Sequence, residues 1–320
     1  MFNFYNKKKI LVTGATGFVG SNIILKLSEL GAHVTGVYCK TKPFLKLKNV
    51  TYKKLDLTDK NDSYKACNNQ DFVFMCAAES SGASVMQRKP LTHLTPNVIM
   101  NTLILESAYL NNIKKFCFIS SSTVYPNISK IIKENDVNFK FFEKYFIVGW
   151  MKLFSEKICE MYSNKIKKNM DIVIVRPSNL YGPFDKFDPQ KSKVVPSLIK
   201  KIDESKKIIK IWGNGKDLKD FIYIEDFIVA LLRIFSLKKK NIGPVNISFG
   251  KSYSINHLLK LLMSISSKKN LKIVYEKNQP TMIPKRFISN LKLRKLIKWK
   301  PINSLKQGLE KTFDWYIRNK

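Results

Sequence analysis

A glycine-rich segment near the N-terminus constrains the fold more than any other feature of this sequence. In VTGATGFVGSNI, residues 12–23, Gly14, Gly17 and Gly20 follow a short apolar run and precede an amphipathic one. The first glycine permits a tight turn, the second permits close approach of a pyrophosphate, and the third permits close helix–sheet packing. Free N–H groups at the start of the helix attract the anion. We therefore expect a dinucleotide site whose loop contacts are Gly14, Thr16, Gly17, Phe18, Val19 and Gly20.

Apolar runs of strand length alternate with amphipathic segments through the first half of the chain. The runs are almost continuously apolar, which is typical of strands buried on both faces of a parallel sheet. They occupy residues 9–14, 33–38, 71–78, 115–122 and 170–177, with helical segments at 19–31 and 97–112. This alternation predicts an α/β fold with a Rossmann-type doubly wound parallel sheet.

The pattern changes after Tyr181. A loop rich in Pro, Asp and Gly covers residues 181–190, and the later segments lack regular strand–helix alternation. We expect a Rossmann domain at residues 1–175 and a smaller C-terminal lobe at residues 176–320, with the chain partly interleaved between them. The smaller lobe would cover the carboxyl edge of the sheet and bind the substrate.

Composition and charge exclude some classes of protein. The chain has 320 residues, 44% of them hydrophobic, but no apolar run near the roughly 20 residues that span a bilayer. No signal segment precedes the first strand, so we expect a cytoplasmic protein. The net charge of +33 is mostly lysine spread along the whole chain. This favours a solvated basic surface over a specific nucleic-acid site.

The cysteines and histidines do not form a metal motif. Five cysteines lack CxxC spacing, and three histidines are scattered along the chain. Cys76 and Cys117 lie in apolar runs. We expect buried, reduced thiols and no metal site.

The residues after the run 33–38, and the segment KKLDLTD at residues 53–59, bear on which dinucleotide binds. An NAD site places an acidic residue after the second strand to hold the ribose hydroxyls. Tyr38 stands there, followed by Lys40 and Lys42, which favours the 2′-phosphate of NADP, with NAD as the alternative. Asp56, followed by Leu57, is a candidate partner for the adenine amino group.

Four motifs together resemble the extended short-chain dehydrogenase/reductase family of NAD(P)-dependent nucleotide-sugar epimerases, dehydratases and reductases. They are the glycine triplet, CAA at residues 76–78, SSSTVYP at 120–126 and RPSNLYGP at 176–183. Residues 179–201 and 211–226 look most like the GDP-L-fucose synthase branch. The resemblance covers almost the whole chain. It implies an NAD(P) cofactor, a nucleotide-sugar substrate, and a homodimer formed by the helix at 97–112 and the helix through Lys152.

The family's chemistry uses a serine, a tyrosine and a lysine. The phenol exchanges a proton with a sugar oxygen, and the lysine lowers the pKa of that phenol and holds the nicotinamide ribose. Carried over by position, Ser121 matches the serine, and Lys152, with Glu156 four residues later, matches the lysine. The tyrosine position then falls on Val148.

Tyr145 is the candidate replacement for the missing phenol. It precedes Val148 by three residues, which predicts that the two side chains share a helix face. In the alternative register Tyr145 is itself the family tyrosine, but Gly149 then occupies the lysine position. Packing with neighbouring phenylalanines competes with a catalytic role for Tyr145. Chemistry led by Lys152 and a water molecule is a third option.

Groups that epimerise the sugar in the GDP-L-fucose synthase branch are also replaced. Thr123 stands where the branch has a cysteine base, and Lys193 stands where it has a histidine acid. Lys219 replaces an arginine and loses the bidentate fork that suits a diphosphate. A threonine hydroxyl is a poor base near neutral pH. The resemblance thus implies a retained pocket with altered proton-transfer groups.

The resemblance also assigns other site residues by position. Asn179 would lie close to substrate and nicotinamide, and Arg286 would bind the nucleotide diphosphate. Trp212 would line the nucleotide pocket or pack in the core. Thr123, Lys193 and Lys219 complete the expected substrate site. The further implied cofactor contacts are Ala77, Ala78, Asn97 and Lys152.

Three functions remain as expectations. The first is an NADP-dependent nucleotide-sugar epimerase, reductase or dehydratase acting on a deoxyhexose. The second is a catalytically silent homologue that binds cofactor or sugar nucleotide as a sensor or partner subunit, and Val148 is the feature that separates these two. The third is an RNA- or membrane-surface binder, whose binding would collapse with salt.

Overall fold

The computed structural model describes residues 2–80, 89, 91–166, 170–188, 192–276 and 283–320. Residues 189–191, which belong to the run 179–201 used for the family resemblance, lie outside the described residues.

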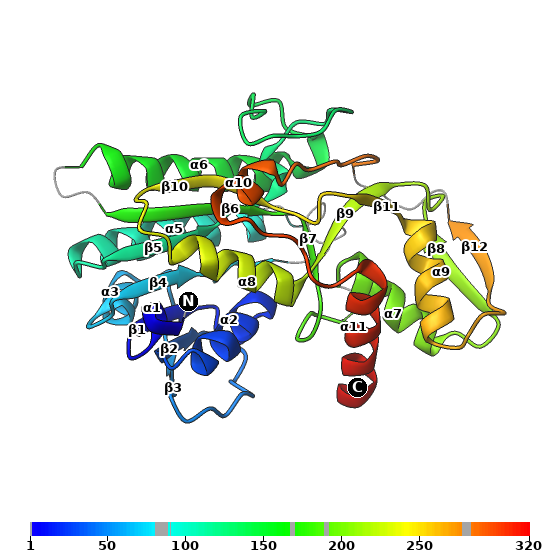
Figure 1. Cartoon of the computed structure of the whole chain (residues 1–320), viewed down its shortest axis with the longest axis horizontal. Helices are drawn as coiled ribbons and strands as arrows, with labels where there is room; N and C mark the ends of the chain where they lie inside the picture. The colour runs from blue at the N-terminus through cyan, green and yellow to red at the C-terminus, as the bar shows by residue number, and fades with distance from the viewer. Residues whose placement is uncertain (1, 81–88, 90, 167–169, 189–191, 277–282) are drawn as a thin grey trace.

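A seven-stranded parallel sheet forms the larger part of the molecule (Figure 1). In spatial order its strands are β10 (Ile242–Ile247), β6 (Asp171–Pro177), β5 (Lys115–Ile119), β4 (Phe72–Met75), β1 (Lys9–Thr13), β2 (His33–Tyr38) and β3 (Val50–Lys54). Every neighbouring pair is parallel. The chain moves outward in opposite directions from β1 and β4. A crevice for ligands opens at the carboxyl ends of strands at such a switch point.

Helices cover both faces of this sheet. One face carries α3 (Lys60–Cys67), α5 (Leu91–Leu110) and α6 (Phe146–Asn164), and the other carries α1 (Phe2–Tyr5), α2 (Phe18–Glu29), α8 (Ile224–Phe235) and α10 (Leu291–Ile297). Figure 1 shows α5 and α6 on the opposite side of the strands from α2 and α8. Strand side chains alternate between two cores, with Ile10 and Val12 in one and Leu11 in the other. The predicted doubly wound α/β fold is confirmed.

A smaller lobe follows β6. It contains β7 (Asn179–Tyr181), β9 (Leu218–Tyr223) and β11 (Ser252–Ser254) in one sheet and β8 (Ile208–Trp212) and β12 (Lys272–Glu276) in another, with α7 (Val194–Glu204), α9 (Ile255–Ile265) and α11 (Leu305–Asn319). In Figure 1, β8, β12 and α9 lie at the far end of the molecule from α3 and β1. The lobe stands on the side of the sheet where the strands end, which positions it over the crevice.

The last strand of the large sheet comes from beyond residue 176. β10 pairs with β6 in parallel, and α8 packs against both strands. The expectation that strand–helix alternation stops at Tyr181 is therefore wrong. Gly243 and Pro244 inside β10 obscured it, because both residue types are depleted in strands and proline lacks an N–H donor. The division into residues 1–175 and 176–320 stays a prediction.

Candidate active site

The glycine loop has the geometry of a phosphate-binding turn. Gly14 follows β1 with φ of +63°, and a Cβ atom there would lie 2.8 Å from Ala77 Cα. A Cβ atom on Gly20 would collide with the carbonyl oxygen of Gly14, so the helix can approach the loop only without one. Gly17 caps the N-terminus of α2. Thr16 and Val19 are half-buried and Phe18 is buried. These residues fit a dinucleotide pyrophosphate, because the glycines add no side chain to the turn at the helix N-terminus.

The end of β4 forms the opposite wall of this turn. The N–H groups of Cys76 and Ala77 each donate to Thr13 Oγ1 at 3.0 Å, which fixes the chain after β4 beside β1. Asn97, on α5, donates to the Glu79 carbonyl at 3.0 Å and accepts from the Glu79 N–H at 2.9 Å. Ala77 and the exposed Ala78 therefore line the crevice across from the glycine loop.

Charged groups surround the expected adenosine end. Lys40 lies just after β2, and its Nζ is 3.8 Å from Glu79 Oε2. Asp56 accepts hydrogen bonds from the N–H and the hydroxyl of Thr58 at 2.9 and 2.7 Å. These bonds hold the pKa of Asp56 below its ordinary value. Leu57 is buried behind this loop. The structure thus groups the residues that the sequence assigned to adenosine.

Lys152 and Ser121 both lie at the carboxyl end of β5. Lys152 projects from α6, donates from Nζ to the Ile119 carbonyl at 2.9 Å, and lies 5.0 Å from the Phe118 ring centroid. Ser121 comes two residues after β5, and its Oγ accepts the Thr123 N–H at 3.1 Å. Burial lowers the pKa of Lys152 to about 8, although the Glu156 carboxylate raises it.

Tyr145 is the N-cap residue of α6 and lies just outside the helix that carries Val148 and Lys152. α6 begins at Phe146, and Tyr145 ends a short 3₁₀ turn, η2 (Glu143–Tyr145), with φ of −113° and ψ of 5°. The helical spacing assumed for Tyr145 therefore holds only from Phe146 onward, and the face shared with Val148 stays a prediction. Burial raises the pKa of Tyr145, and the charges beside it belong to Arg286 and Asp217.

Arg286 and Lys219 form a buried basic cluster beside Tyr145. Arg286 Nη1 donates to the Pro126 carbonyl at 3.0 Å, and the Arg286 N–H donates to the Leu218 carbonyl at 2.9 Å. Lys219 Nζ donates to the Ile283 carbonyl at 3.2 Å and lies 3.9 Å from Asp217 Oδ2. Burial lowers the pKa of Arg286 to about 10 and that of Lys219 below its ordinary value. Two buried cations beside one carboxylate favour an anionic ligand.

The predicted epimerising positions hold no proton-transfer pair. Thr123 Oγ1 is buried and has no hydrogen-bond partner within the described ranges. It belongs to η1 (Ser122–Val124), which packs so closely on α6 that a Cβ atom on Gly149 would lie 2.9 Å from the Thr123 carbonyl oxygen. Lys193 is an exposed residue before α7, with Nζ 5.7 Å from the Phe18 ring centroid. Thr123 thus lies against α6, whereas Lys193 lies beside Phe18 of α2.

Two further predicted residues lie in the smaller lobe. Asn179, in β7, donates to the Asp220 carbonyl at 2.8 Å and is half-buried. Trp212 ends β8 with 43% of its surface exposed, so the core alternative is wrong. Its ring lies 5.4 Å from Lys201 Nζ.

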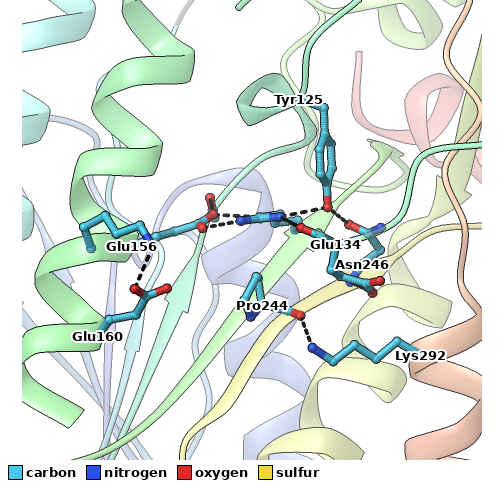
Figure 2. Close-up of polar contacts among 10 residues, drawn as sticks. Tyr125, Glu134, Glu156, Glu160, Pro244, Asn246 and Lys292 are labelled. Atoms are coloured by element: carbon cyan, nitrogen blue, oxygen red, sulfur yellow. Dashed lines mark hydrogen bonds and ion pairs between the residues drawn. The ribbon is translucent and has the colours of Figure 1, made fainter. Parts of the chain in front are cut away.

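A buried polar network behind Lys152 was not predicted. It joins Glu156, Arg176, Tyr125, Asn246 and Glu134 (Figure 2). The sequence offered one signal, since Glu156 stands four residues after Lys152. Its partners come from separate strands and loops, which spacing alone does not connect.

No helix of the described ranges is long and apolar enough to cross a membrane. Among the residues that the structure describes, no cluster of His, Cys, Asp or Glu is arranged to hold a metal ion.

Comparison with known proteins identifies the family to which this chain belongs. Residues 10–248 match the NAD dependent epimerase/dehydratase family, which confirms the resemblance inferred from the motifs. A GDP-L-fucose synthase of Sinorhizobium fredii is 30% identical, over 98% of this chain and 96% of that protein. A dTDP-4-dehydro-6-deoxy-D-allose reductase of Streptomyces bikiniensis is 27% identical, over 97% of this chain and 96% of that protein.

The fold has close matches among solved structures. A UDP-glucose 4-epimerase from Thermotoga maritima, solved with UDP-glucose, aligns with a TM-score of 0.86. The alignment covers 97% of this chain and 99% of that chain at 24% sequence identity. This similarity concerns the fold, and the chemistry has to be argued from the residues described above.

Proposed function

Because the chain belongs to the NAD dependent epimerase/dehydratase family, we propose that it is an NADPH-dependent reductase of a nucleoside-diphosphate keto-deoxyhexose. The supporting observation is a series of neighbouring residues that connects the glycine loop, through Lys152, to the basic cluster of Arg286 and Lys219. Gly14 abuts Ala77, and the neighbouring Cys76 interacts electrostatically with Lys152. On the other side of η1, Arg286 Nη1 lies 3.4 Å from the Tyr125 carbonyl oxygen. These neighbours connect the cofactor loop, Lys152 and the basic cluster, which supports a single shared site.

Each group has a distinct part in this proposal. Bound NADPH supplies the hydride. Lys152 donates a proton to the carbonyl oxygen of the sugar, and Ser121 donates a hydrogen bond to the same oxygen. A pKa of about 8 leaves Lys152 mostly protonated at pH 7 and a stronger acid than an ordinary lysine. Arg286 and Lys219 hold the diphosphate.

Tyr145 belongs on the substrate side in this proposal. The charges of Arg286 and Asp217 beside it support a contact with the phosphate end of the substrate. Reduction without 3,5-epimerisation is favoured, because the Thr123 hydroxyl is a poor base and Lys193 lies beside Phe18 of α2 instead of α6. The relative named as a reductase of a 4-dehydro-deoxysugar is consistent with that choice.

Direct conversion tests the proposal. The purified chain is mixed with NADPH and a panel of GDP- and dTDP-4-keto-6-deoxyhexoses, and NADPH loss at 340 nm is followed together with products by chromatography and mass. We expect NADPH loss matched by a product two mass units heavier than one of the keto sugars. Tight NADPH binding without loss of NADPH on any member of the panel would contradict the proposal.

A catalytically silent binding protein is the second candidate. The observation in its favour is Val148, which is half-buried one turn before Lys152 and carries no ionisable group. Such a protein would bind NADPH and sugar nucleotide with no change in either. The same panel separates the two candidates, because only an enzyme consumes NADPH.

The cofactor preference follows from Lys40. Replacing Lys40 with alanine removes a charge expected to meet the 2′-phosphate, so the Kd for NADPH should rise about tenfold while the Kd for NADH stays unchanged. Fluorescence titration of both cofactors measures this. Lys65→Ala, an exposed lysine on α3, is the charge-matched control. Equal weakening of both cofactors would point to a role other than phosphate recognition.

We also propose that the outer face of α5 and α6 binds a second copy of this chain. Phe146, Trp150 and Phe154 recur at four-residue spacing on α6 and are 48, 39 and 47% exposed. Ile99, on the neighbouring α5, is 38% exposed. An apolar stripe of this kind on adjacent helices is typical of a protein interface.

Replacing Phe154 with glutamate should dissociate the dimer, because it places a charge within the apolar stripe. Sedimentation velocity should show a dimer for the unmodified chain and a monomer for the variant. Ile302→Glu, at a site 80% exposed before α11, is the control and should remain dimeric. A monomeric unmodified chain would refute the interface.

A further inference from the structure

An ion pair is fully buried one helical turn beyond Lys152. The Glu156 and Arg176 side chains are 1 and 4% exposed. Arg176 Nε donates to Glu156 Oε1 at 2.9 Å, and Nη2 donates to Oε2 at 2.6 Å. The Ser120 hydroxyl also donates to Glu156 Oε1. α6 is thereby joined through one carboxylate to the ends of β5 and β6.

The remaining terminal nitrogen of Arg176, Nη1, also donates hydrogen bonds to buried groups. Nη1 donates to Tyr125 Oη at 3.0 Å and to the Glu134 carbonyl at 2.8 Å. Tyr125 Oη donates to Asn246 Oδ1 at 2.5 Å, and the Asn246 N–H donates to Glu134 Oε1 at 2.9 Å. Figure 2 shows these contacts as one line from Glu156 to Asn246. Burial raises the pKa of Tyr125 to about 12, so its phenol stays protonated.

Stability alone is a weak reason for such an arrangement. Removing two charges from water costs several kcal/mol per ion, and apolar residues of similar volume often serve the fold as well. The position of Glu156 relative to Lys152 gives a better reason for the buried ion pair. Glu156 stands four residues after Lys152 in the same helix, so the two side chains are neighbours on one face.

We propose that Glu156 is a positioning residue, held by Arg176 and Ser120, whose carboxylate keeps Lys152 an ammonium group directed at the Ile119 carbonyl. This inference rests on the proposed proton donation by Lys152. With valine at position 148 no phenol shares the task, so the charge state of the lysine decides whether a proton is available.

The groups around Lys152 make Glu156 the decisive one. α6 contributes Glu156 and Cys159, the chain after β4 contributes Cys76, and β5 contributes the Phe118 ring and the Ile119 carbonyl. Burial raises the pKa of both thiols far above the working range, so they are neutral. Glu156 is therefore the carboxylate that opposes the loss of the lysine proton.

Glu156→Gln should lower the pKa of Lys152, because the favourable charge is lost and the Arg176 charge remains. Competitive acetylation across pH 6–10, read by mass spectrometry of the Lys152 peptide, measures this pKa without any substrate. We expect a fall of about one unit or more. Glu160→Gln is the matched control, since Glu160 stands one turn further along α6, half-buried, with its Oε2 2.8 Å from Lys157 Nζ. It should leave the pKa of Lys152 unchanged.

A second variant covers the case in which Glu156→Gln fails to fold. Glu156→Gln with Arg176→Met replaces the ion pair by neutral side chains, a change that buried pairs often tolerate. The pKa of Lys152 should still fall, by less than in the single variant, because Glu156 is the nearer charge. An unchanged pKa in either folded variant would overturn the proposal and leave Glu156 a structural residue.

The labelling result is independent of turnover. A lowered pKa in a chain that reduces no keto sugar would uphold the positioning role and refute the proposed reductase. An active chain whose Lys152 pKa is unchanged in the Glu156 variants would support the proposed reductase and refute the positioning role of Glu156.

Discussion

Replacing Lys152 with methionine should lower kcat for keto-sugar reduction by about 10²- to 10⁴-fold, the usual contribution of a positioned proton donor. Methionine fills similar volume beside the Phe118 ring but has no proton to give. Steady-state rates with NADPH and the best substrate of the panel measure the effect. Lys157→Met is the control, because Lys157 is exposed on the same helix and should keep full activity.

Proton donation by Lys152 also predicts the direction in which kcat changes with pH. The Lys152 pKa is lowered to about 8, so the donating ammonium form prevails below that pH and is lost as pH rises through it. The kcat of the unmodified chain should therefore fall above pH 8. A profile flat to pH 10, or a Lys152→Met variant with unchanged kcat, would exclude Lys152 as the donor.

Replacing Val148 with tyrosine should raise kcat about tenfold or more, since it restores a phenol one turn before Lys152 on the same helix face. The adjacent ammonium group lowers the pKa of such a phenol and so makes it a better donor. Rates are compared at the same pH and cofactor concentration as for the unmodified chain.

Val148→Phe separates proton transfer from packing. It adds the same ring without the hydroxyl, so it should give none of the gain. Equal gains from tyrosine and phenylalanine would mean that the ring improves packing or substrate binding. Activity in Val148→Tyr, with none in the unmodified chain, would support the silent binding protein.

Much of the larger domain followed from the sequence. Continuous apolar runs predicted the buried parallel strands, and the glycine triplet predicted the loop beside Ala77. Both signals are local, since they depend on residues near one another in the chain. The sequence did not predict β10, because Gly243 and Pro244 interrupt its apolar pattern. The position of β10 in the sheet depends on its pairing with β6, which is distant in sequence.

The site was harder to predict where it depends on helix boundaries and distant contacts. Tyr145 was assigned by helical spacing, yet α6 begins one residue later, and the backbone turn directs Tyr145 toward the charges of Arg286 and Asp217. The partners of Glu156 are distant in sequence, as with Arg176 twenty residues on. Such contacts come from the sheet topology, which no short motif encodes.

Hydride transfer to a sugar is the central claim, and isotope transfer tests it most directly. NADPH labelled with deuterium at C4 of the nicotinamide, on each face in turn, is incubated with the chain and a 4-keto sugar nucleotide, and the product is read by mass spectrometry. We predict that one of the two labelled cofactors gives a product one mass unit heavier than the product from unlabelled NADPH. The label should lie at C4 of the hexose. NADPH bound at the glycine loop, with no label in any product, would contradict the account.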